Sequence, residues 1–83
     1  IPDYEYDPQR LLLNKELGVQ LEKALRVLPD KLRTVVLLYD VEGLPYDEIA
    51  AIAGCPLGTV KSRLFNARAA LRARLDPYLA GRA

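Results

Sequence analysis

Residues 44–75 read LPYDEIAAIAGCPLGTVKSRLFNARAALRARL, and this stretch decides the fold. It predicts a short helix that ends at Ala53, a tight turn, and a longer helix from about Pro56 to Leu75. Gly54 suits the left-handed conformation that commonly follows a helix, and a proline fits the first turn of the next one. A short helix, a glycine turn and a longer helix together predict a helix-turn-helix.

Two more helices are expected upstream, where leucines recur at helical spacing. Asp7 and Pro8 are typical of a helix start, and the first helix is expected to run from there to about Val27. A second helix is expected between Pro29 and Gly43, because proline favours the first helical position and glycine follows the last. The sequence therefore predicts an all-α fold of four helices with a C-terminal helix-turn-helix, winged-helix-like but without a wing.

The chain has 83 residues, which is enough for one domain. We expect a linker at residues 1–7, the helix-turn-helix domain at 8–75 and a frayed tail at 76–83, because Pro77 disfavours a helical conformation in the residue before it. The chain contains no methionine, even at its start. It is therefore expected to be a piece of a longer protein.

Composition argues against several classes of function. The chain has no histidine and a single cysteine, Cys55, so neither an internal disulfide nor a cysteine-rich metal site is possible. Asp47 and Glu48 are neighbours that do not face each other on a helix, and their charges complement the helix dipole. We therefore expect no enzyme activity, no cofactor and no metal. Cys55 is interpreted as a small apolar corner residue, with redox sensing as the less favoured alternative.

No apolar run approaches the roughly 20 residues that a membrane span requires, and no signal-peptide pattern is present. Without either feature, a reducing cytoplasm is the expected location and no membrane partner is expected.

Positive charge is concentrated in the last third of the chain. Residues 1–56 hold ten acidic and six basic residues, whereas residues 57–83 hold six basic residues and one acidic residue. A basic stripe on one helix predicts a polyanionic partner. An ordinary solvated helix face is the alternative, and the preceding turn motif favours the first interpretation.

The last helix divides into faces at about 100° per residue. The stripe expected to be buried comprises Leu57, Val60, Leu64, Ala67, Leu71 and Leu75. Ser62 projects almost opposite, and the outward half also holds Gly58, Phe65, Asn66, Ala69 and Ala73. Long cations flank this outward half, with Lys61, Arg68 and Arg72 on one side and Arg63 and Arg74 on the other. Small outer groups between two rows of cations are typical of a helix that enters the major groove of DNA.

The residues predicted to contact DNA are Thr59, Lys61, Ser62, Arg63, Phe65, Asn66 and Arg68. Asn66 suits bidentate pairing with adenine, Lys61 suits donation to guanine, and Phe65 suits contact with a thymine methyl group. Ser62 can donate or accept. The alternative for Phe65 is that its ring packs against Leu44 or the C-terminal tail.

Residues 44–75, with Leu28-Pro29 and the DVEG sequence at 40–43, resemble region 4 of the extracytoplasmic-function sigma factors. The resemblance covers about residues 9–75, and the GTVKSRL sequence at 58–64 is its most specific part. It implies a domain of sigma region 4 type that reads the minus-35 promoter element. It also implies docking on the flap of the RNA polymerase β subunit and an anti-sigma factor that covers these surfaces.

The resemblance further implies base and phosphate contacts at Lys61, Ser62, Arg63, Phe65 and Asn66. The chain departs from the family at Asn66, where relatives often carry a basic residue. It also departs at Pro45, where a serine helix cap is common. A missing N-terminal half would melt the minus-10 element, so this part alone is not expected to initiate transcription.

Two further interpretations stay open from the sequence. One is a sigma-like decoy that binds an anti-sigma factor without binding DNA, although such a decoy has no need of five bases on one helix. The other is a free-standing helix-turn-helix regulator, which would dimerise on a palindromic site.

Overall fold

The computed structural model describes the backbone of residues 15–80 and the side chains of residues 15–78. Its elements are α2 (Lys15–Val27), α3 (Asp30–Val36), a π-helical segment η1 (Leu37–Val41), α4 (Tyr46–Ala53) and α5 (Leu57–Ala80). The predicted all-α fold and the predicted helix-turn-helix, formed by α4 and α5, are confirmed. The predicted linker and the predicted helix start at Asp7 lie outside the described residues.

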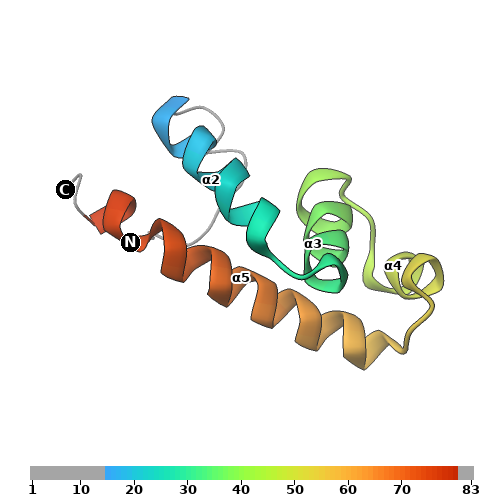
Figure 1. The fold of residues 1–83 in the computed structure, drawn as a ribbon. Coiled ribbons are helices and arrows are strands. Elements are labelled where there is room, and N and C mark those ends of the chain that lie inside the picture. The colour runs from blue at the N-terminus through green and yellow to red at the C-terminus, as the bar shows by residue number, and fades with distance from the viewer. Residues whose placement is uncertain (1–14, 81–83) are drawn as a thin grey trace.

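Helix α5 is the element on which the other helices pack. Its 24 residues correspond to about 36 Å of helix, and the longest dimension of the molecule is 39 Å. Helices α2, α3 and α4 lie in chain order along one side of α5 (Figure 1), and each of them contacts it. Among the elements that the structure describes, none packs on the opposite side of α5, which is called its open side below.

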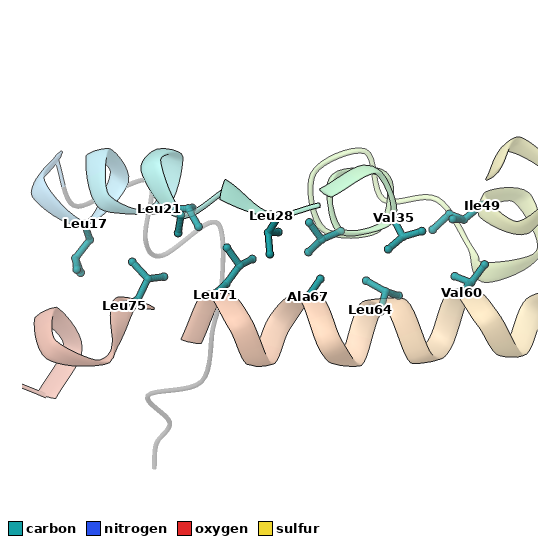
Figure 2. Packing of buried hydrophobic residues seen from close by; sticks show 12 residues of the cluster. Leu17, Leu21, Leu28, Val35, Ile49, Val60, Leu64, Ala67, Leu71 and Leu75 are labelled. Carbon is teal, nitrogen blue, oxygen red and sulfur yellow. The ribbon is translucent and has the colours of Figure 1, made fainter. Parts of the chain in front are cut away.

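A single row of α5 side chains forms one wall of the core (Figure 2). The row consists of Val60, Leu64, Ala67, Leu71 and Leu75, all buried as predicted. Buried side chains from the three shorter helices and from the break between α2 and α3 face it, among them Leu17, Leu21, Leu28, Val35 and Ile49. The prediction that Leu57 is buried is wrong, since 41% of that residue is exposed. Because Leu57 is the first residue of α5, the helices packed on α5 cover it incompletely.

The corner between α4 and α5 depends on Gly54. Its backbone is left-handed, with φ 68° and ψ 39°. The N–H groups of Gly54 and Cys55 both donate to the carbonyl of Ala50, at 2.9 and 3.1 Å. These bonds satisfy the end of α4, and a residue with a Cβ would cost about 1–2 kcal/mol in this conformation. The predicted glycine cap is confirmed.

The second predicted helix differs from the observed one. Instead of one regular helix as far as Gly43, the α-helical part ends at Val36 and the chain widens into η1. The N–H of Glu42 donates to the carbonyl of Leu37 at 3.0 Å, which is the spacing of a π-helix. Asp40 lies within this widened turn and pairs with Arg68 of α5. The local pattern gives no signal for this, because the pairing is made 28 residues away.

The predicted end of the last helix at Leu75 is also wrong. Helix α5 continues to Ala80 with Pro77 inside it, so the predicted tail is helical as far as that residue. Proline removes one backbone hydrogen bond from a helix interior. Tyr78 is half-buried and packs against the core, so tertiary packing stabilises a turn that the local sequence disfavours.

Arg33 ties the end of α2 to the start of α3. Its Nε donates to the carbonyl of Leu25 at 3.0 Å and its Nη2 to the carbonyl of Leu28 at 2.9 Å. Its Nη1 donates to Asp30 at 2.8 Å. One guanidinium therefore satisfies carbonyl groups that the break between the two helices leaves without helical partners.

Replacing Arg33 with lysine is expected to lower the free energy of unfolding by about 1–2 kcal/mol, because one ammonium cannot replace the two guanidinium nitrogens that donate to separate, partly buried carbonyls. Lysine keeps the charge but cannot form the planar fork. Urea denaturation followed by circular dichroism measures the change. Arg26→Lys is the control, because Arg26 pairs with Glu22 on an exposed face and is expected to contribute less than about 0.5 kcal/mol. Equal losses in the two variants would contradict the capping role of Arg33.

Candidate nucleic-acid interface

The open side of α5 carries the predicted reading residues. Ser62, Phe65 and Asn66 are exposed, and Thr59 is half-buried one turn earlier. The hydroxyl of Ser62 donates to the carbonyl of Thr59 at 3.1 Å, so its oxygen can still accept a hydrogen bond from outside. The first three turns of α5 after the corner thus present a hydroxyl, an aromatic ring and an amide to the outside.

Phe65 is the most exposed large apolar residue among those described. Its exposed fraction is 72%, so the alternative in which the ring packs against Leu44 or the C-terminal tail is wrong. An exposed aromatic ring of this size is unfavourable in water. Its position between Ser62 and Asn66 on the open side therefore indicates a surface that is covered by a partner.

The exposed residues Ser62, Phe65 and Asn66 form a ridge on the open side of α5. A hollow of about 450 Å³ lies on one flank of this ridge. Its lining combines cations with two aromatic rings and consists of Tyr46, Lys61, Leu64, Phe65, Arg68, Ala69 and Arg72. The ammonium of Lys61 lies 5.7 Å from the centre of the Tyr46 ring, at cation–π distance. The three cations that the helical spacing placed on this flank therefore do lie together.

Arg68 has a partner within the protein. Its guanidinium donates through two nitrogens to the carboxylate of Asp40, with Nε at 3.1 Å from Oδ2 and Nη2 on Oδ1. It also lies over the Tyr39 ring, 5.3 Å from the ring centre. The sequence predicts a DNA contact for Arg68, and the structure places this side chain in a bidentate ion pair with Asp40 while 42% of it stays exposed.

The other flank holds a smaller hollow of about 280 Å³. Its lining residues come from α3, the corner and α5, and are Asp30, Lys31, Thr34, Ala53, Gly54 and Arg63. The Nη1 of Arg63 donates to the Sγ of Cys55 at 3.7 Å, which holds the half-buried arginine against the corner. The half-buried Cys55 therefore acts as a hydrogen-bond acceptor as well as a packing residue.

Tyr46 and Lys31 line these hollows and were not among the residues predicted from the sequence. Tyr46 opens α4 and Lys31 lies in the first turn of α3, so both are far from the basic stretch of α5 in the sequence. The helical periodicity of α5 alone does not reveal these two residues. Their signal is tertiary, because α3 and α4 both pack on α5 and bring polar residues to the two edges of the ridge.

Comparison with known proteins identifies the family of this chain. The sequence profile described as sigma-70, region 4 matches residues 18–71, which is more than half of the chain. The chain belongs to the sigma-70 region 4 family. The predicted resemblance is therefore confirmed, and the matched residues include α3, η1, α4 and most of α5.

Curated relatives of this region 4 chain are named as sigma factors. It is 41% identical over 73 residues to the ECF RNA polymerase sigma-E factors of Escherichia coli and Salmonella typhimurium, covering 88% of the chain and 38% of each relative. It is 42% identical over 72 residues to the RNA polymerase sigma-H factor of Pseudomonas aeruginosa, covering 87% of the chain and 37% of the relative. The chain thus spans less than two fifths of the length of these relatives.

Within the described part of this region 4 domain, no helix is both long enough and apolar enough to cross a membrane. The same part of the chain contains no cluster of three or more metal-ligating side chains of the cysteine, aspartate or glutamate kind.

Proposed function

We propose that this chain is the promoter-reading domain of an RNA polymerase sigma factor and that α5 enters the major groove of the minus-35 element. The observation that carries the proposal is the ridge of Ser62, Phe65 and Asn66, which stands between two hollows that each contain at least two cations, the smaller one also Asp30. A helix in the major groove has a phosphate backbone on either side. The two cationic flanks match those two walls.

The residues take different roles in this proposal. Thr59, Ser62, Phe65 and Asn66 face the base edges, and Lys61 is the cation nearest to them on its flank. Arg63 and Lys31 face one phosphate wall and Arg72 faces the other. Arg68 keeps its pairing with Asp40 and lines the same flank as Lys61 and Arg72, so we assign it no base contact.

Protein partners follow from the family. The relatives are named as RNA polymerase sigma factors, so we infer that the chain works together with RNA polymerase. By the family resemblance, it docks on the flap of the β subunit and is covered by an anti-sigma factor when inactive. A domain that reads promoter DNA acts where the chromosome lies, which in bacteria is the cytoplasm. The proposed activity needs no catalytic group, cofactor or metal.

The salt dependence of DNA binding tests the phosphate contacts. Arg63→Ala is expected to weaken binding to all duplexes by a similar factor and to reduce the slope of log K against log salt by about one, because one fewer counterion is released. Fluorescence anisotropy with a labelled promoter duplex at several salt concentrations measures both quantities.

The control for this experiment is Arg26→Ala, which removes an equal charge from the exposed face of α2. Its slope is expected to match that of the parent chain. An unchanged slope in Arg63→Ala, or binding by the parent chain that does not depend on salt, would contradict the proposed phosphate contact.

A further inference from the structure

The carboxylate of Asp40 is nearly inaccessible, with only 5% of its side chain exposed. It accepts hydrogen bonds from two nitrogens of Arg68, a residue of α5 that is 28 positions away in the sequence. A buried carboxylate is costly unless it is paired and hydrogen-bonded, and a bidentate arginine is the strongest partner for it. Asp40 therefore fixes the Arg68 guanidinium in one position.

The Arg68 guanidinium lies over the ring of Tyr39, which in turn contacts the ring of Tyr46. It lies 5.3 Å from the centre of the Tyr39 ring, and the Tyr39 and Tyr46 rings lie 5.0 Å apart with an interplanar angle of 32°. The side-chain hydrogen bond with Tyr46 raises the pKa of Tyr39 above its ordinary value. Contacts thus run without a gap from η1 through α5 to the first residue of α4.

The last member of this series is Lys61, whose ammonium lies 5.7 Å from the centre of the Tyr46 ring. A lysine side chain has many rotamers, and ordering it costs up to about 2 kcal/mol. An aromatic face that attracts the ammonium favours one of these rotamers before a ligand arrives. The position of the Tyr46 ring therefore affects the position of Lys61.

We propose that Asp40 is a positioning residue for base reading, which holds the Lys61 side chain in place through Arg68, Tyr39 and Tyr46. The inference rests on the proposed function, because it concerns the DNA contact that Lys61 makes. It assigns to a buried acid, which DNA cannot touch, an effect on the choice of DNA sequence. If the Asp40–Arg68 pair only joined η1 to α5, its loss would lower stability without changing the choice of DNA sequence.

The test uses Asp40→Asn in the 83-residue chain, because asparagine keeps the shape of the side chain and removes the charge that holds Arg68. The quantity measured is the specificity ratio, which is the affinity for a duplex selected by the parent chain divided by the affinity for a scrambled duplex. This ratio is expected to fall by about threefold to tenfold, the range typical of coupled neighbouring residues. Circular dichroism at the same temperature establishes that the variant is folded.

A double-mutant cycle separates positioning from simple support. In a Lys61→Gln background, Asp40→Asn is expected to change the specificity ratio by less than about twofold, because the side chain through which it acts is gone. An unchanged ratio in the single variant, or the same loss in both backgrounds, would overturn the proposal. Glu22→Gln is the control, since it removes an equal charge and breaks an arginine pair on the exposed face of α2. It is expected to leave the ratio unchanged.

Two additions keep the test decisive. If Asp40→Asn does not fold, Tyr46→Leu removes the aromatic platform while Asp40 and Arg68 remain, and it is expected to lower the ratio to the same extent.

An NMR measurement without DNA follows the Lys61 methylene protons, which the Tyr46 ring shifts upfield in the parent chain. Loss of this shift in Asp40→Asn supports the positioning role even if the parent chain selects no duplex, in which case only the proposed function fails. A shift that persists overturns the positioning role.

Discussion

Replacing Ile49 with alanine is expected to lower the free energy of unfolding by about 2–5 kcal/mol. Ile49 is fully buried where α4 meets α3 and α5, beside Val35 and Val60 (Figure 2). Truncating a buried isoleucine to alanine costs about 2–5 kcal/mol, because apolar burial is lost and a cavity stays behind. A domain of this length has a total stability of about 4–12 kcal/mol. At the lower end of that range, the loss is therefore comparable to the total stability of the domain.

The helix that contains Ile49 also contains its control. Ile52 lies on the same helix with 61% of its surface exposed, so Ile52→Ala removes the same atoms from a site that is already largely in water. Its expected cost is less than about 0.5 kcal/mol. Urea denaturation of both variants, followed by circular dichroism, measures the difference. Similar losses in the two variants would contradict the account of the core, because they would mean that α4 is not held by its Ile49 face.

Replacing Asn66 with alanine is expected to abolish the base preference at one position of the DNA site. Asn66 is exposed on the ridge, and its amide can pair with adenine through two hydrogen bonds. Such a pair contributes about 1–3 kcal/mol of discrimination against the other bases. The variant should bind duplexes with any of the four base pairs at that position almost equally, while its preferences elsewhere in the site remain. Competition binding with a set of singly substituted duplexes measures this.

The pattern of loss distinguishes base reading from general weakening. Gln20→Ala removes another side-chain amide, from the half-buried edge of α2, and is expected to leave every base preference unchanged. A uniform loss across all duplexes in Asn66→Ala would contradict the assignment, since it would mean that the amide contacts the DNA backbone. The departure from the family at this position makes the experiment informative, because an amide and a cation prefer different bases.

The features of the fold that depend on local rules could be predicted from the sequence. Gly54 marks the corner because few other residues adopt a left-handed backbone without strain. The spacing of Val60, Leu64 and Leu71 gives the buried side of α5, because helical periodicity depends only on residue order. The exposed ridge follows from the same periodicity. These signals are complete within a few neighbouring residues.

The remaining features depend on contacts between distant segments. Pro77 stays inside α5 because Tyr78 packs on the core, and no local pattern reports that packing. The pairing of Asp40 with Arg68 joins η1 to α5 and accompanies the π-helical turn. Lys31 reaches the edge of the ridge only through the docking of α3. In each case the deciding partner lies in another element, so periodicity and capping rules could not identify it.

The central claim, that the open ridge of α5 enters the groove, is tested most directly by an NMR titration of the isotope-labelled chain with a selected duplex. The account predicts that the largest backbone amide shifts fall between Thr59 and Asn66, with smaller shifts at Lys31 and Tyr46. The outward face of α2 should stay unperturbed. Large shifts on that face of α2 together with an unperturbed ridge would contradict the account.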